Sequence, residues 1–232
     1  MSNTFLNMIK KNKELHQEFA NRYKFIGAGK FMASYYDEES NLVYKVFKLS
    51  VLKKDNEHSR RVTEYPEHIF ETIMNAKNSK KDKLLIDTIW KNNYEWPLFC
   101  MNNHHKFKNI PKVFEIFHYP EAFGFAYSTE YLESVKKYSS NKLDYLFIEG
   151  INNCFYSRHH YKKDFFEYFS PAYFSMTQEA YTKRLKYVKP KELKKLSNLI
   201  YKKFKSNEID LHSKNFMFRK RDDCLIINDP LY

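Results

Sequence analysis

The order of two strand-rich segments followed by a long helical segment is the feature that most limits how this chain can fold. Residues 23–50, YKFIGAGKFMASYYDEESNLVYKVFKLS, carry two β-rich runs around the turn-forming cluster DEESN. This pattern predicts a strand, a glycine turn, a strand, a hairpin and a third strand. Two more strands are expected at 112–118 and 123–131, separated by YPEA. Strands first and helices afterwards indicate an α+β fold.

Helical patterns dominate the chain from about residue 134 onward. In residues 189–204 the apolar side chains fall on one face of an amphipathic helix. The members of this face are Leu193, Leu196, Leu199, Ile200 and Phe204. The aromatic-rich residues 145–174 allow two interpretations: core packing or, if their rings are exposed, a base-stacking surface for nucleic acid. Further helices are expected at 5–20, at 66–76 and at 84–101.

Composition narrows the class of protein. With 232 residues, of which 43% are hydrophobic, the chain can form one domain or one two-lobed domain with a real core. The formal net charge of +12 indicates either an acidic partner or simply an abundance of lysine along the whole chain. Cys100, Cys154 and Cys224 are widely spaced, so neither a zinc site nor a disulfide framework is expected. Without a signal-peptide pattern or a long apolar stretch, we expect a cytoplasmic protein with no membrane partner.

A glycine pair and a strand lysine are the first candidate site residues. Gly27 and Gly29 lie between two predicted strands, where they either close a hairpin or let the backbone approach a phosphate. A strand on each side excludes a Rossmann fingerprint, and no Gly-Lys-Ser/Thr ending marks a Walker A loop. Lys45 lies in the third strand, where it either faces solvent or grips the phosphates of a nucleotide under the glycine turn.

The last two dozen residues carry three side chains that suit magnesium chemistry. Asp210 and Asn215 lie on the loop DLHSKN, and Asp229 follows the apolar run CLIIN. An aspartate on such a loop can accept a proton from a hydroxyl nucleophile, and carboxylate and amide oxygens suit Mg²⁺. Each residue alone could equally be a turn or cap residue. Their order after a glycine turn and a strand lysine is what points to phosphoryl transfer.

Four stretches, IGAGKFMASYY, VYKVFK, IPKVFEIF and IDLHSKNFMFRKRDDCLIINDPLY, resemble a protein-kinase-like phosphotransferase. More narrowly, they resemble the early serine/threonine protein kinases of short-tailed, autographivirus-type bacteriophages. The Asp-x-His-x-x-Asn form followed by Ile-x-Asp-Pro is typical of these kinases and of aminoglycoside phosphotransferases. The resemblance covers residues 24–232. It implies a bilobal fold, with an N-terminal antiparallel β-sheet lobe and a leading helix at 1–133, and a minimal, mainly helical lobe at 134–232.

The resemblance also implies roles in binding ATP. Gly27 and Gly29 would cover its phosphates, and Lys45 would pair with the α- and β-phosphates. The backbone of the hinge, from Glu130 to Leu132, would meet the adenine.

In the same way, the resemblance implies the catalytic and metal-binding residues. Asp210 would be the catalytic base, and Asn215 and Asp229 would be the Mg²⁺ ligands. Three acidic residues are alternative partners of Lys45: Glu64, Glu67 and Glu71.

Several positions depart from the family pattern. Met32 stands where a third glycine is usual, Glu208 and Ile209 precede the catalytic loop, and Pro230 follows Asp229. Because the sequence ends three residues after Asp229, we expect no activation segment there, which leaves open how a protein substrate docks.

The sequence therefore predicts an ATP- and Mg²⁺-dependent serine/threonine protein kinase of a bacteriophage. Its expected substrates are host proteins of transcription or RNA metabolism in the bacterial cytoplasm, with self-phosphorylation as a further expectation. The alternatives are a small-molecule kinase of the aminoglycoside phosphotransferase type and a pseudokinase that inhibits a host protein by binding. Nucleic acid is not expected as the primary partner, because no recognition motif is present.

Overall fold

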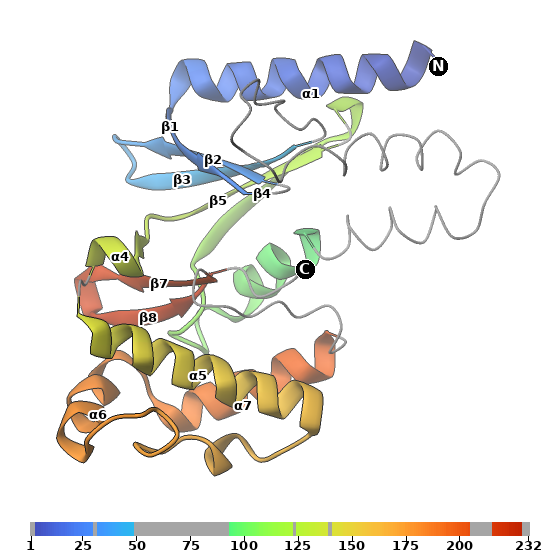
Figure 1. Ribbon diagram of the computed structural model, residues 1–232. Helices are drawn as coiled ribbons and strands as arrows, with labels where there is room; N and C mark the ends of the chain where they lie inside the picture. Colours follow the sequence, from blue (N-terminus) through green and yellow to red (C-terminus); the bar gives the residue numbers. More distant parts are fainter. Residues whose placement is uncertain are drawn as a thin grey trace, which may run out of the picture. The chain divides into compact units, whose positions relative to one another are not determined.

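The computed structural model describes residues 3–29, 32–48, 93–122, 124–138, 141–204 and 215–228. The chain forms two compact units, one made of Met1–Leu98 and Val113–Tyr131 and the other of Phe99–Lys112 and Leu132–Tyr232. Each unit combines an antiparallel sheet with helices (Figure 1), which confirms the predicted α+β class. The units differ from the predicted division at residue 133, because residues 99–112 group with the second unit. The assignment of an ATP-binding lobe and a catalytic lobe stays a prediction.

The first unit is built on a five-stranded antiparallel sheet in the order β1-β2-β3-β5-β4. Its strands are β1 (Lys24–Ala28), β2 (Met32–Asp37), β3 (Leu42–Phe47), β4 (Val113–Tyr119) and β5 (Gly124–Glu130). Both predicted strand-rich segments are therefore confirmed. Asn41 closes the DEESN turn with a left-handed φ of 57°, a conformation that asparagine tolerates well. The YPEA segment contains the 3₁₀ turn η1 (Pro120–Ala122) between β4 and β5.

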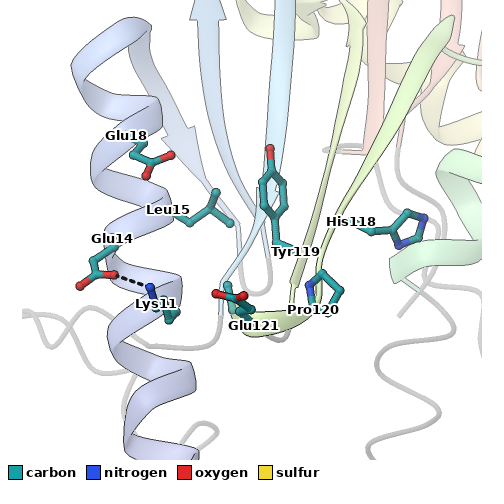
Figure 2. A pocket seen from close by; sticks show the side chains of 9 residues that line it. Lys11, Glu14, Leu15, Glu18, His118, Tyr119, Pro120 and Glu121 are labelled. Atoms are coloured by element: carbon teal, nitrogen blue, oxygen red, sulfur yellow. Dashed lines mark ion pairs between the residues drawn. The ribbon is translucent and has the colours of Figure 1, made fainter.

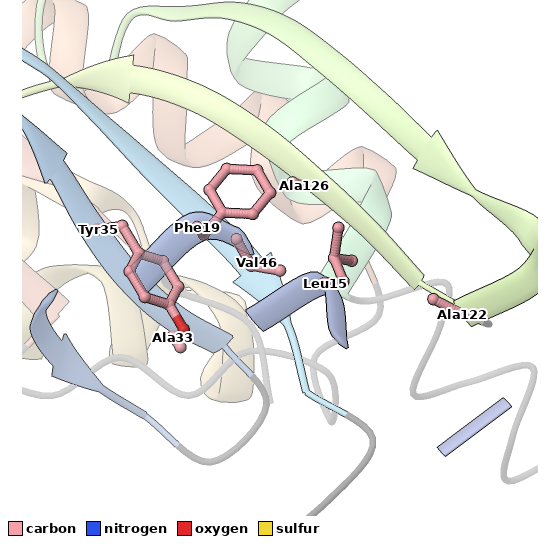
Figure 3. Packing of buried hydrophobic residues seen from close by; sticks show 7 residues of the cluster. All are labelled: Leu15, Phe19, Ala33, Tyr35, Val46, Ala122 and Ala126. Atoms are coloured by element: carbon pink, nitrogen blue, oxygen red, sulfur yellow. The ribbon is translucent and has the colours of Figure 1, made fainter. Parts of the chain in front are cut away.

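Helix α1 (Asn3–Arg22) covers one face of this sheet. Leu15 and Phe19 of α1 pack against small and aromatic side chains of β2, β3, β5 and η1 (Figure 3). Asn12, on the same helical face, is fully buried, and its side-chain amide donates to the carbonyl oxygens of Phe47 and Ala122 over 3.1 and 3.4 Å. Polar and apolar contacts together therefore fix where α1 lies on the sheet.

The second unit consists of helices around a three-stranded antiparallel sheet in the order β6-β7-β8. The helices are α4 (Val135–Tyr138), α5 (Lys142–Tyr161), α6 (Gln178–Arg184) and α7 (Pro190–Lys203), with 3₁₀ turns η2 (Phe165–Glu167), η3 (Leu185–Tyr187) and η6 (Lys220–Asp222). The strands are β6 (Glu133–Ser134), β7 (Phe216–Arg219) and β8 (Cys224–Ile227). The predicted amphipathic helix is confirmed as α7, and residues 93–103 are also helical.

Local sequence explains where these helices begin and end. The side chain of Asn141 accepts from the backbone N–H of Leu143 and caps α5, and Pro190 occupies the first turn of α7. Five of the eleven Phe and Tyr side chains of residues 145–174 are buried, as the core-packing interpretation predicts; they are Phe147, Phe155, Phe165, Phe169 and Phe174. Four others in the same segment are exposed: Tyr156, Tyr161, Phe166 and Tyr173.

Two predicted helices lie wholly or partly outside the described residues. They are the helix from Pro66 to residue 76 and residues 84–92 of the helix predicted at 84–101. Within the described part of the chain, no helix combines the length and the apolar character that a membrane span requires.

Candidate functional site

The strand register brings Gly27 and Lys45 into one row across the first sheet. Gly27 on β1 pairs with Ser34 on β2, and Ser34 pairs with Lys45 on β3. Lys45 in turn pairs with Tyr127 on β5, which pairs with Ile116 on β4. Residues directly opposite one another in antiparallel strands share a face of the sheet. The glycine turn and the strand lysine therefore lie on the same face, separated by one strand.

This row lies on the face of the sheet that α1 does not cover. Val46 packs against α1, and side chains alternate along a strand, so Lys45 points to the opposite face. Lys45 is neither fully exposed nor buried, and its Nζ atom lies 5.9 Å from the ring centroid of Tyr127. A cation over an aromatic ring is held in place by the ring quadrupole. The lysine is thus positioned by its neighbours rather than extended into solvent.

The two glycines of the turn differ in their surroundings. At Gly27 a β-bulge shifts the register of β1, and φ is +158°, a value that L side chains rarely adopt. A Cβ atom added to Gly27 would meet no atom of the described residues within 4 Å, so these residues leave space beside this backbone. Gly29 donates its N–H to the carbonyl oxygen of Met32 over 2.8 Å and so closes the turn. Gly27 therefore offers a close approach to the backbone, whereas Gly29 holds the turn together.

The predicted hinge begins at the end of β5. Glu130 is the last residue of β5 and pairs with Leu42 of β3 in the first unit. Leu132 belongs to the second unit, where its buried side chain packs against Cys224, Ile226 and Met217. The side chain of Leu132 is thus part of the core beside β8. The contact between the hinge backbone and adenine stays a prediction.

The β7–β8 hairpin closes at Asn215, one of the predicted metal ligands. The backbone N–H of Asn228 donates to the backbone carbonyl oxygen of Asn215 over 2.8 Å, one step beyond the pair Phe216 and Ile227. Asn215, which precedes β7, therefore lies beside Asn228, the residue immediately before Asp229. The apolar run that was predicted to end at Asp229 is confirmed as strand β8, and its four residues are all buried.

Two residues that the motif analysis missed hold this hairpin in the second unit. The side-chain N–H of Asn109 donates to the carbonyl oxygen of Leu225 over 2.7 Å, and the backbone carbonyl oxygen of Asn109 accepts from the N–H of Ile227 over 2.8 Å. The buried guanidinium of Arg219 donates to the carbonyl oxygens of Lys108 and Ile110 over 3.0 and 3.2 Å. More than 100 residues separate these partners in the sequence, so no local pattern could have linked them.

The other end of the hairpin is fixed by charge. Asp223 has a left-handed φ of 49°, and its carboxylate accepts from the hydroxyl group of Tyr138. Lys186 Nζ lies 3.3 Å from the same carboxylate. The hydrogen bond from Tyr138, with a smaller contribution from Lys186, lowers the pKa of Asp223, while burial raises the pKa of Tyr138. This carboxylate is engaged in holding the turn.

Several predicted site residues lie outside the described residues. They are the catalytic candidate Asp210, the metal candidate Asp229 and the possible lysine partners Glu64, Glu67 and Glu71. Within the described ranges, no group of three or more His, Cys, Asp or Glu side chains is arranged to hold a metal ion. Asn215, with an amide oxygen of the kind that Mg²⁺ accepts, is the predicted metal ligand for which the structure gives a position.

A cavity of about 310 Å³ lies elsewhere in the first unit, between α1 and the β4–η1 turn (Figure 2). Glu14, Glu18 and Glu121 supply three carboxylates to its lining, and Lys11 pairs with Glu14 over 3.7 Å. Because α1 forms one wall, the cavity lies on the face of the sheet opposite Lys45. Three carboxylates would repel a polyphosphate, so this cavity is not the predicted nucleotide site.

Comparison with known proteins leaves the family open. No protein family and no curated protein sequence matches this chain. Among solved structures, the chain is similar to the apo form of PpkA-294 with a TM-score of 0.40 and 11% identity, over 88% of this chain and 56% of that one. The chain thus spans little more than half the length of that structure.

Proposed function

We propose that this chain is an ATP- and Mg²⁺-dependent phosphotransferase, and specifically a serine/threonine protein kinase of the bacteriophage type. The observation that carries the proposal is the closure of the β7–β8 hairpin between Asn215 and Asn228. It brings the backbone of Asn215 next to Asn228, the residue that precedes Asp229 in the sequence. An asparagine amide and an aspartate carboxylate are oxygen ligands of the kind that Mg²⁺ accepts in phosphoryl transfer.

The proposed roles follow from the chemistry of each side chain. Asn215 and Asp229 would hold Mg²⁺, and Lys45 would bind the phosphates of ATP beside the open backbone of Gly27. The bound metal would neutralise charge that develops on the phosphoryl oxygens. Asp210 would orient the acceptor hydroxyl and take its proton. Catalysis would then depend on positioning and charge stabilisation, without a covalent enzyme intermediate.

The proposal also names the molecules that receive the phosphate. We propose that the phosphate goes to serine and threonine residues of host bacterial proteins, with transcription and RNA metabolism as the target processes. The hydroxyl of a protein side chain suits an aspartate base as well as the hydroxyl of a small molecule does. An experiment must therefore distinguish a protein acceptor from a small-molecule acceptor.

The test is transfer of label from γ-labelled ATP to bacterial lysate proteins or to the chain itself. The expected result is labelling by the wild type and a loss of at least about a hundredfold, about 2.7 kcal/mol of barrier, in Asp210→Ala and Lys45→Met. Lys24→Met is the matched control, because Lys24 is exposed on β1 of the same sheet. Near-wild-type transfer by Asp210→Ala would falsify the assignment. Transfer to aminoglycosides alone would replace the protein acceptor with a small molecule.

A further inference from the structure

A surface of basic and aromatic side chains covers part of the second unit. We call it the α5–α7 surface and define it by residues 156–168 and 190–204. These two segments contain eight Lys or Arg residues and three Asp or Glu residues. The basic residues are Arg158, Lys162, Lys163, Lys191, Lys194, Lys195, Lys202 and Lys203. The two segments therefore carry a net formal charge of +5.

Contacts between side chains join the two segments into one surface. Arg158 on α5 donates to the side-chain oxygen of Asn198 on α7 over 2.9 Å, and its guanidinium lies 5.0 Å from the ring of Tyr201. Lys194 on α7 lies 2.8 Å from the carboxylate of Asp164 and 4.8 Å from the ring of Phe166. Cations and aromatic rings therefore alternate along one side of α7.

The helical period places further lysines in line on α7. Lys191, Lys195 and Lys202 are spaced by four and seven residues, which puts them on one face of the helix, and all three are exposed. At a rise of about 1.5 Å per residue they span roughly 16 Å. The opposite face of α7 is buried through Leu193, Leu196 and Ile200. The lysine row is therefore a solvent-facing stripe of positive charge.

Exposed aromatic rings accompany this charge. Tyr161 is 63% exposed and Phe166 is 40% exposed. Of the seven large hydrophobic side chains that are exposed in the described part of the chain, four lie between residues 156 and 173. The exposure of such rings normally costs free energy, because water orders around them. A partner that stacks on them would recover that free energy.

We propose that the α5–α7 surface binds single-stranded nucleic acid. Lysine and arginine would neutralise phosphates, and the exposed rings would stack on unpaired bases. Acidic protein segments would match the charge but leave the rings without a flat partner, and a duplex would present no unpaired base to stack. This binding function does not depend on the proposed kinase activity.

The test measures the affinity of the full chain for a labelled short oligonucleotide of mixed sequence, as single strand and as duplex, at several salt concentrations. Tyr161→Ala and Phe166→Ala are each expected to weaken single-strand binding about fivefold or more, because a stacked base is lost. Tyr161→Phe keeps the ring and is expected to restore binding. Phe114→Ala is the matched control, because Phe114 is exposed on β4 in the other unit.

The charge contribution is tested separately. Lys191→Gln, Lys195→Gln and Lys202→Gln combined should reduce the slope of log affinity against log salt by about 2, since each phosphate contact contributes about 0.7 for single strands. The control combines Lys13→Gln, Lys106→Gln and Lys142→Gln, three exposed lysines outside the surface, and should leave the slope unchanged.

Three outcomes would overturn the proposal. Equal binding of duplex, or equal competition by polyglutamate, would identify a general polyanion surface without base stacking. An equal loss in the control lysine variant would assign binding to net charge alone. Unchanged affinity in both Tyr161→Ala and Phe166→Ala would remove the stacking rings from the site. Circular dichroism of each variant checks that the fold is retained.

Discussion

Asn228 donates its backbone N–H to the carbonyl oxygen of Asn215 over 2.8 Å, so a main-chain hydrogen bond ties the open end of the β7–β8 hairpin. This bond involves neither asparagine side chain. Metal binding and hairpin closure can therefore be tested separately at Asn215. A change of the Asn215 side chain can alter metal binding without breaking the hairpin.

Asn215→Ala is expected to reduce phosphoryl transfer at least tenfold and to raise the Mg²⁺ concentration required for half-maximal transfer, because one oxygen ligand is lost. Asn228→Ala is the control and should stay within about twofold of the wild type, since the backbone bond is kept. Transfer would be measured over a Mg²⁺ titration. An unchanged Mg²⁺ requirement in Asn215→Ala would remove this residue from the metal site.

Asn109→Ala is expected to lower the free energy of unfolding by about 1–3 kcal/mol, because the carbonyl oxygen of Leu225 loses a buried amide donor. Urea denaturation measures this loss. Asn102→Ala, at an exposed position on the preceding helix, should change stability by no more than about 0.5 kcal/mol. An equal effect of the two substitutions would mean that the bond from Asn109 does not stabilise the hairpin.

The ion pair between Arg184 and Asp144 is nearly inaccessible to water, with Nε and Oδ1 2.8 Å apart. Removal of one partner leaves a buried charge uncompensated, so Arg184→Met alone should cost about 3–5 kcal/mol. The double substitution Arg184→Met with Asp144→Leu should be distinctly less destabilising than the single one, because no charge remains buried. Denaturation of the single and double variants measures their free energies of unfolding. A double variant that loses at least as much stability as Arg184→Met alone would contradict the prediction.

Gly150 lies under the ring of Phe174, where an added Cβ atom would come within 2.4 Å of the ring. Because Phe174 is buried and cannot swing away, Gly150→Ala should destabilise the second unit by about 1–3 kcal/mol. Combining it with Phe174→Leu makes room, so the double variant should cost less than the two single losses together. Thermal denaturation of the two single variants and the double variant measures these losses of stability.

His16 gives a prediction about pH. Its Nε2 lies 3.1 Å from the carbonyl oxygen of Phe47, which can only accept, so this nitrogen carries the proton, and Nδ1 faces the hydroxyl of Tyr35 over 2.9 Å. Burial lowers the pKa of His16 below its usual 6.5, and the charge of Lys48 adds to this, although the bond to Phe47 opposes it.

Because the pKa of His16 is lower in the folded chain, the unfolded chain binds more protons between the two values. The contribution of His16 to stability is therefore complete above about pH 6.5 and is lost as the pH falls through that value towards the folded pKa. Denaturation of the wild type and of His16→Gln from pH 7.5 to pH 5 tests this. The difference between the two curves should shrink on acidification, and a constant difference would refute the assignment.

Local patterns were sufficient for many of the strands and helices and for the fold class. Alternating residues and turn clusters located β2, β3, β4 and β5, and the spacing of the leucines located α7, because these signals lie within one element. The motif residues Lys45 and Asn215 were likewise visible as residue types in a suitable order.

Tertiary structure decided which residues meet. Only the strand register places Ser34 and Tyr127 in the row of Lys45, and only the fold brings Asn109 and Arg219 to the β7–β8 hairpin. It also decided that Phe155 is buried while Tyr156, its neighbour, is exposed. The physical reason is that register, burial and long-range hydrogen bonds depend on partners that are distant in the sequence. Turns and amphipathic faces, by contrast, are determined by residues that are close together in the sequence.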